Sequence, residues 1–214
     1  TRSLVGSEMC IRDSPSIFHV MEAKLKKEVW KKKVDVAIHK LWKESIEEEA
    51  AGKSSMIYLN PTYTPNKPHH LWETTSTCPR DVRRAGIKAK MASGAYILQY
   101  NRARFNQTHD TTCPLCKEAE EDVPHFLVSC PALADVRESL LSDMMEEIPL
   151  VFEDHPTRGW NPQQIAHLIL DATHPDVADL LPISEYMLTR LESKSRILCF
   201  ALHRSRALTL GYRP

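Results

Sequence analysis

Between Cys113 and Cys130 the sequence reads CPLCKEAEEDVPHFLVSC. Cys113 and Cys116 form a Cys-x-x-Cys pair, which is typical of a tight turn that directs two sulfur atoms at one point. His125 follows after eight residues and Cys130 after four more, so the four side chains fall within 18 residues. Three thiolates and one imidazole match the tetrahedral preference of Zn²⁺ and leave no position for water. The spacing therefore predicts one structural zinc ion in a closed Cys-Cys-His-Cys site, and no zinc-dependent hydrolysis.

The same cysteines allow two other interpretations, a redox-active pair and a chance grouping. No strand–helix unit of the thioredoxin type surrounds Cys113 and Cys116, which disfavours redox chemistry. The remaining cysteines, Cys10, Cys78 and Cys199, are scattered along the chain. Because no secretory signal is present, a reducing compartment and a metal site fit better than a disulfide framework. We expect an intracellular protein, with nucleus and cytoplasm equally open.

The overall composition is that of a globular protein with strong local charge. Apolar residues make up 42% of the 214 residues, and 28 basic residues balance 28 acidic ones. No stretch approaches the roughly 20 apolar residues that cross a bilayer, so we expect a soluble chain with no membrane partner. Residues 1–14 resemble a translated cloning adapter, are expected to be disordered, and are left out of the fold prediction.

Apolar residues recur at spacings of three and four along most of the chain, whereas strand signals are nearly absent. The sequence therefore predicts a mainly α fold, a helical domain with a small embedded Cys-Cys-His-Cys zinc module.

The expected helices are a long one from about Glu22 to Ala51, one from Pro79 to about Met91, one carrying Tyr96 to Phe105, and others starting at Pro131, at Asn161-Pro162 and at Ser184, the last ending near Leu208. The expected parts are the adapter-like 1–14, an N-terminal helix and proline-containing connector in 15–78, a basic helix pair with the zinc module in 79–148, and C-terminal helices in 149–214.

A basic segment precedes the zinc motif. Between Pro79 and Gln107 there are seven basic residues and one acidic residue. Guanidinium groups bind phosphates bidentately, and aromatic rings offer stacking surfaces for unpaired bases. The segment predicts nucleic-acid contacts by Arg80, Arg83, Arg84, Lys88, Arg102 and Arg104. The other interpretation is a solvated helix face with its tyrosines in the core.

Two further patterns carry less weight. The loop inside the zinc motif is acidic, with Glu118, Glu120, Glu121 and Asp122, so its tip should be a poor phosphate contact. His174-Pro175-Asp176 matches the tripeptide of co-chaperone J domains. The surroundings lack the lysine-rich helix of that domain, and we interpret the match as chance.

Three stretches together carry a family likeness: residues 88–107 with the run Arg-Ala-Arg-Phe-Asn, then Cys113-Pro-Leu-Cys116, then residues 125–134, HFLVSCPALA. They resemble the reverse-transcriptase zinc-binding module near the C-terminal end of animal non-LTR (LINE-type) retrotransposon polyproteins. The likeness extends over nearly all of the chain after residue 14. By position, it implies that the family's zinc ligands fall on Cys113, Cys116, His125 and Cys130.

The resemblance implies a tail domain that helps a retrotransposon protein grip RNA or target DNA during target-primed reverse transcription. The expected partners are RNA, DNA and the polymerase body of the parent polyprotein. No Tyr/Phe-x-Asp-Asp polymerase signature occurs, and there is no room for an endonuclease domain, so we expect a non-catalytic module. The alternative is a packing or scaffold domain of the same polyprotein without nucleic-acid affinity of its own.

Overall fold

The computed structural model describes residues 27–62, 64–106, 108–148, 157 and 159–212. The expectations for residues 1–14 and for the start of the first helix lie outside these ranges. The chain divides into two compact units, Thr1–Gly52 with Pro61–Asn66, and Lys53–Asn60 with Lys67–Pro214.

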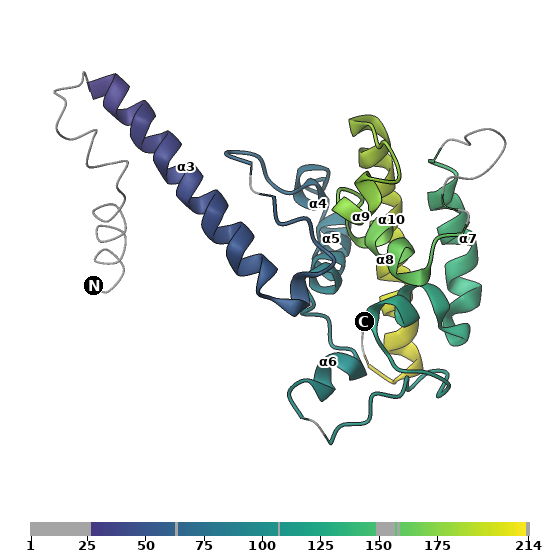
Figure 1. Cartoon of the computed structure of the whole chain (residues 1–214). Helices are drawn as coiled ribbons and strands as arrows, with labels where there is room; N and C mark the ends of the chain where they lie inside the picture. The colour runs from purple at the N-terminus through teal and green to yellow at the C-terminus, as the bar shows by residue number, and fades with distance from the viewer. Residues whose placement is uncertain (1–26, 63, 107, 149–156, 158, 213–214) are drawn as a thin grey trace. The chain divides into compact units, whose positions relative to one another are not determined.

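The first unit contains one long helix, α3 (Lys27–Ala51), drawn in purple to blue in Figure 1. Its predicted end is confirmed, because the chain leaves the helix at Gly52, whose N–H donates to the carbonyl of Glu48 at 3.2 Å. Exposed pairs four residues apart, such as Lys40 with Glu44 at 3.8 Å, run along its surface. Pairs of this kind stabilise a helix by only about 0.3–0.5 kcal/mol each.

The second unit is built around the last helix, α10 (Glu185–Thr209), which packs against α5 (Pro79–Ala92) and α7 (Ala134–Met145) (Figure 1). Leu191, Leu198 and Leu202 of α10 are buried in this core. The predicted boundaries of α10 are confirmed to within a residue. A mainly helical fold is confirmed; among the described residues the sole β contact is an isolated bridge between residues 112 and 120.

Helix α8 (Pro162–Leu170) begins as its sequence predicts. The side chain of Asn161 accepts from the N–H of Gln164 at 2.9 Å, and the Gln164 side chain accepts from the N–H of Asn161 at 3.0 Å, which forms a capping box. α8 packs against a π-helical turn, η2 (His125–Ser129), and against α9 (Pro175–Ala178). The cysteine segment and the C-terminal helices therefore share one core.

The proline-containing connector holds two short helical pieces, η1 (Ser54–Met56) and α4 (His70–Glu73). Its polar groups converge on the buried Asp171. The backbone N–H of Asn60 donates to Asp171 Oδ2 at 2.7 Å, and His69 Nε2 lies 3.1 Å from the same oxygen. Asp171 therefore ties the parts of the connector that belong to the second unit to the end of α8.

The helix expected from Tyr96 to Phe105 is wrong in length, since only α6 (Gln99–Ala103) forms. Gly94 adopts a φ of +69°, and the N–H of Tyr96 donates to the carbonyl of Lys90 at 2.8 Å, which turns the chain away from α5. The Asn101 side chain then donates to the Tyr96 carbonyl at 2.9 Å. These bonds use backbone groups that a longer helix would need, so the apolar spacing alone overestimates the helix.

Candidate metal centre and the basic face beside it

The Cys-x-x-Cys segment folds into a tight loop. The N–H of Lys117 donates to the Cys113 carbonyl at 2.9 Å, and the Cys113 N–H donates to the Ala119 carbonyl at 2.8 Å. Lys117 occupies the left-handed region with a φ of +63°. The bridge between Thr112 and Glu120 closes the base of the loop. Backbone bonding therefore holds Cys113 and Cys116 on the inside of one turn.

A π-helical turn supplies the other two side chains. The Cys130 N–H donates to the His125 carbonyl at 2.7 Å, five residues back, while the His125 N–H donates to Asp122 Oδ1, also at 2.7 Å. Residues five apart on an α-helix would lie about 140° apart around the axis. The wider π turn brings His125 and Cys130 to the same side. The sequence spacing pointed to one helical turn but not to its type.

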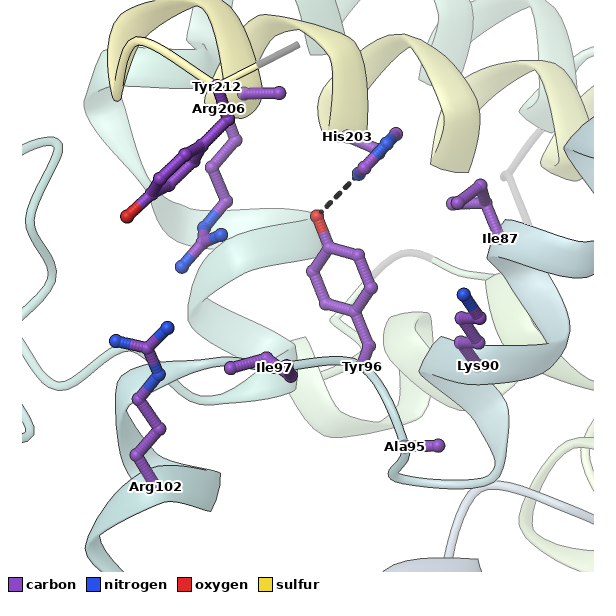
Figure 2. Close-up of a pocket in the computed structure, with 10 residues that line it drawn as sticks. Ile87, Lys90, Ala95, Tyr96, Ile97, Arg102, His203, Arg206 and Tyr212 are labelled. Carbon is purple, nitrogen blue, oxygen red and sulfur yellow. Dashed lines mark hydrogen bonds between the residues drawn. The ribbon is translucent and has the colours of Figure 1, made fainter. Parts of the chain in front are cut away.

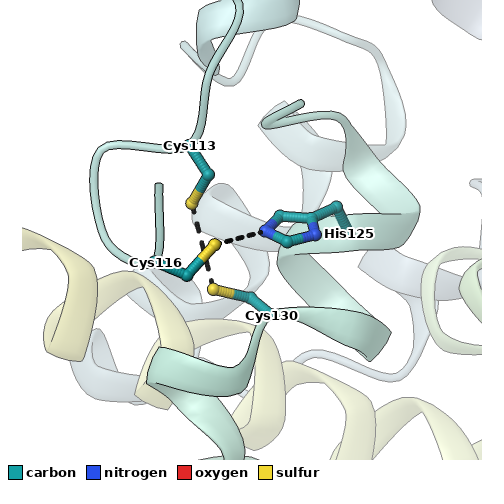
Figure 3. A group of neighbouring side chains, drawn as sticks. All are labelled: Cys113, Cys116, His125 and Cys130. Carbon is teal, nitrogen blue, oxygen red and sulfur yellow. Dashed lines mark hydrogen bonds between the residues drawn. The ribbon is translucent and has the colours of Figure 1, made fainter. Parts of the chain in front are cut away.

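The four side chains meet in one cluster (Figure 3). Cys113 Sγ lies 3.9 Å from Cys130 Sγ, and Cys116 Sγ lies 3.4 Å from His125 Nε2. All four ligand atoms lie within 4.8 Å of one another. The sulfurs are too far apart for a disulfide, whose S–S bond is about 2.05 Å. Cys113 and Cys130 are 1% and 0% exposed, so the cluster is a buried group that could hold a metal ion.

Backbone N–H groups point at the sulfur atoms. Burial raises the pKa of Cys116, but hydrogen bonds from the N–H of Glu118, from the neighbouring thiols of Cys113 and Cys130, and from another backbone N–H lower it below its ordinary value overall. For Cys130 burial dominates, the Ala132 N–H opposes it only in part, and the pKa rises to about 12. The cluster thus stabilises a thiolate at one position and needs a nearby positive charge at another.

Arg137 supplies positive charge behind the cluster. It comes from α7, is buried, and its Nη1 donates to the Cys130 carbonyl at 3.0 Å. Burial lowers the Arg137 pKa, and the negative charge of Cys130 raises it in part. Arg137 is not among the residues that the motif spacing predicts; the signal for it is its place, seven residues after Cys130 on the helix that follows Pro131.

The loop inside the cysteine motif is not uniformly exposed. Glu121 is fully buried and receives two hydrogen bonds from Arg206, at 2.7 and 2.9 Å. It also accepts from the N–H of Gln99 at 2.9 Å. Glu121 therefore joins the loop to the C-terminal end of α10 and to the start of α6, whereas Glu118 and Glu120 remain exposed at the loop.

The structure divides the six predicted nucleic-acid contacts. Lys88 is 0% exposed; its Nζ donates to Glu192 Oε1 at 2.8 Å and to Ser195 Oγ at 2.6 Å. The inclusion of Lys88 among the phosphate contacts is therefore corrected, because α10 covers that end of the α5 face. Arg84 is half-buried, with its Nε enclosed. The exposed members are Arg80, Arg83, Arg102 and Arg104, of which Arg83 lies over the Phe200 ring and Arg104 donates to Ser54.

The His174-Pro175-Asp176 tripeptide has a local role. His174 caps α9 by accepting from the N–H of Asp176 at 3.2 Å, with Pro175 in the first turn. His174 Nδ1 also lies 2.7 Å from Nδ1 of the buried His167, whose Nε2 lies 2.9 Å from the Gln163 amide. The three groups His167, His174 and Asp176 are close enough to hold a cation, and Asp176 Oδ2 lies 3.4 Å from His167 Nδ1.

No protein family, curated protein or solved structure matches this chain. Of the helices that the structure describes, none combines the length and the apolar character needed to cross a bilayer.

Proposed function

We propose that Cys113, Cys116, His125 and Cys130 hold one structural Zn²⁺ ion. The observation that supports it most strongly is the spacing of their donor atoms. A tetrahedral zinc ion separates two thiolate sulfurs by about 3.8 Å, and a sulfur from an imidazole nitrogen by about 3.5 Å. The corresponding distances in the cluster are 3.9 Å and 3.4 Å.

The donor set also fits zinc chemically. Zinc accepts mixed sulfur and nitrogen ligands, and four protein ligands leave no open position for substrate. Arg137 and the backbone N–H groups around the sulfurs would offset the negative charge of three thiolates. When bound, the ion would cross-link the loop carrying Cys113 to the π turn, and so couple metal binding to folding.

We further propose that this module binds nucleic acid, as the tail region of a LINE-type reverse transcriptase. The support is the resemblance of residues 88–107, 113–116 and 125–134, together with exposed arginines: Arg80 and Arg83 on α5, Arg102 on α6 and Arg104 directly after α6. Glu121 links the loop of the cysteine motif to the first turn of α6 by accepting from the Gln99 N–H, and to α10 by its ion pair with Arg206. Loss of zinc should therefore disturb the basic face.

The test is binding of a labelled single-stranded RNA and a duplex DNA over a salt series, with and without a zinc chelator. The informative variant is Arg80→Gln/Arg102→Gln/Arg104→Gln, and the matched control is Arg190→Gln, an exposed arginine of α10 that pairs with Glu147. For each arginine that binds a phosphate, its replacement should reduce the slope of log K against log salt by about 0.7–0.9. The triple variant should bind nucleic acid more weakly, with a flatter slope of log K against log salt. Chelation of zinc should abolish the binding of the unmodified chain. An unchanged slope would refute the assignment.

A second candidate function is a packing domain that docks on the polymerase body. The observation in its favour is on α3, where Trp30, Val36 and Trp42 are exposed. A contiguous exposed apolar patch marks a protein-contact surface. On α3 such a patch would combine Val29 with Val36 and Trp30 with Leu41, all of which are exposed. This alternative expects self-association of the isolated chain and weak, salt-insensitive RNA binding.

A further inference from the structure

A pocket of about 300 Å³ opens between the C-terminal ends of α5 and α10 and the segment leading into α6. Figure 2 shows its lining, to which α5 contributes Lys90, α6 contributes Arg102 and α10 contributes Arg206. No aspartate or glutamate is among the residues that line it. The pocket lies beside the proposed zinc module but shares no ligand with it.

The charged groups of the pocket favour an anion. Figure 2 shows the guanidinium groups of Arg102 and Arg206 facing each other from opposite walls. Arg206 is neutralised by its pair with Glu121, whereas neither Arg102 nor Lys90 has an ion-pair partner in the described part of the chain. The pKa of His203 is lowered first by burial and then by nearby positive charges, Arg206 and Lys90 among them. Arg102 and Lys90 lie on opposite sides of Tyr96 in Figure 2, so the pocket carries positive charge at both ends and attracts an acidic ligand.

The remaining walls favour a flat apolar group. Ile97 and Tyr212 are 58% and 59% exposed at the pocket. Tyr96 forms a fixed part of the lining, because its ring stacks on Phe126 with centroids 5.6 Å apart and its hydroxyl lies 2.9 Å from His203 Nδ1. The pocket therefore combines cations with apolar and aromatic surface.

Tyr212 is held in place by the end of α10. Gly211 adopts a φ of +74°, its N–H donates to the Leu208 carbonyl at 3.1 Å, and the Tyr212 N–H donates to the Ala207 carbonyl at 2.8 Å. This pair of bonds is a Schellman motif, which fixes the direction of the chain after a helix. The backbone of Tyr212 is thus oriented by the helix end, and its ring is directed at the pocket.

We infer that this pocket binds one unpaired nucleotide of a single-stranded nucleic acid, with its phosphate at Arg102 and its base against Tyr212 and Ile97, which lie on the same side of Tyr96 as Arg102 in Figure 2. The volume exceeds what a lone phosphate needs and is at the lower end of small-ligand sites, about 300–1,000 Å³. A base inside a duplex has both faces covered by its neighbours, so only an unpaired base can enter such a pocket. This inference rests on the proposed nucleic-acid binding and adds a preference for single strands.

The test uses the full zinc-loaded chain with a labelled single-stranded RNA and a blunt duplex of the same length. Removing the ring in Tyr212→Ala should weaken single-strand binding by about 5- to 100-fold, as measured for base-stacking aromatics, with duplex binding changed less than about twofold. Tyr212→Phe should retain the affinity, and Arg190→Gln should have no effect on either ligand. A nucleoside monophosphate should compete with the single strand but not with the duplex.

The outcomes separate the pocket from the broader function. If the unmodified chain binds both ligands and Tyr212→Ala changes neither, or changes both equally, the pocket inference is overturned while nucleic-acid binding stands. If the unmodified chain binds neither ligand, both proposals fail. If the monophosphate binds but the single strand does not, the pocket is a free-nucleotide site and the inference is overturned.

Discussion

Replacing Lys88 with methionine should destabilise the second unit strongly, because Lys88 is half of a buried ion pair. Its Nζ lies 2.8 Å from Glu192 Oε1 and both side chains are 1% exposed. The other carboxylate oxygen of Glu192, Oε2, is buried without a hydrogen-bond partner among the described residues. Lys88→Met would leave that carboxylate in the core without the ammonium group from which Oε1 accepts a hydrogen bond.

Removing one partner of a buried pair costs about 3–5 kcal/mol, because the other charge stays buried and uncompensated. For a unit of this size, 1 kcal/mol corresponds to about 2–4 °C in Tm, so the melting temperature should fall by about 6–20 °C. The double variant Lys88→Met/Glu192→Leu should recover most of the loss, since apolar groups replace a buried pair at little cost.

Urea unfolding followed by far-UV circular dichroism measures these free energies. The matched control is Lys90→Met, two residues along the same helix but exposed, for which a change within about 0.5 kcal/mol is expected. A loss below about 1 kcal/mol for Lys88→Met would refute the buried pair. So would additive losses in the double variant, because two sites that interact cannot be additive.

Three further changes have outcomes fixed by the structure. Gly94→Ala should lower the free energy of unfolding by about 2–4 kcal/mol, because φ is +69° and the new Cβ would lie 2.6 Å from the carbonyl oxygen of Ser55; chemical denaturation showing no loss would refute this contact. Arg137→Gln should weaken zinc binding by about 10- to 100-fold in competition with a chromophoric chelator, since second-layer groups tune metal affinity; equal affinity would exclude that role. Asp171→Asn should cost more stability near pH 5.5 than near pH 9, and a pH-independent cost in unfolding experiments would contradict the pairing with His69.

The sign of that pH dependence follows from the two shifts. For Asp171, burial raises the pKa, but the His69 hydrogen bond and charge, with the Asn60 N–H, hold it well below its usual range. For His69, burial lowers the pKa, but the hydrogen bond to Asp171 and the negative charge of Asp171 together outweigh burial, so the pKa is raised overall. The stabilisation that ionised Asp171 contributes is lost as pH falls through its lowered pKa in the folded state. The stabilisation that protonated His69 contributes is complete below about pH 6.5, the pKa of an unfolded histidine, and is lost as pH rises through the raised pKa of His69 in the folded state.

The local features of this fold were predictable from sequence because their causes are local. The capping pattern at Asn161 and Gln164 places the start of α8, and the spacing of Cys113, Cys116 and His125 brings these residues into one cluster. Each depends on residues within a few turns of one another, where steric and hydrogen-bond rules act directly.

The role of individual charges was not predictable, because their partners lie far away in sequence. Lys88 shares a helix face with exposed arginines, but its partner Glu192 is 104 residues away in the sequence. Only the packing of α10 against α5 shows that Lys88 is covered. In the sequence Glu121 is one of four acidic loop residues, but in the structure it is buried and pairs with Arg206, which lies 85 residues later. Spacing tells which residues share a face and does not tell which part of that face is buried.

The most direct test of the central claim is the metal content and metal-dependent stability of the full chain. Elemental analysis and native mass spectrometry should find one zinc ion per chain, and Co²⁺ substitution should give the visible absorption of a tetrahedral thiolate site. Cys130→Ser should lower the metal content, and a chelator should lower the melting temperature of the unmodified chain but not that of the variant. A chain that takes up no zinc, and that melts at the same temperature with and without chelator, would contradict a structural zinc site at Cys113, Cys116, His125 and Cys130.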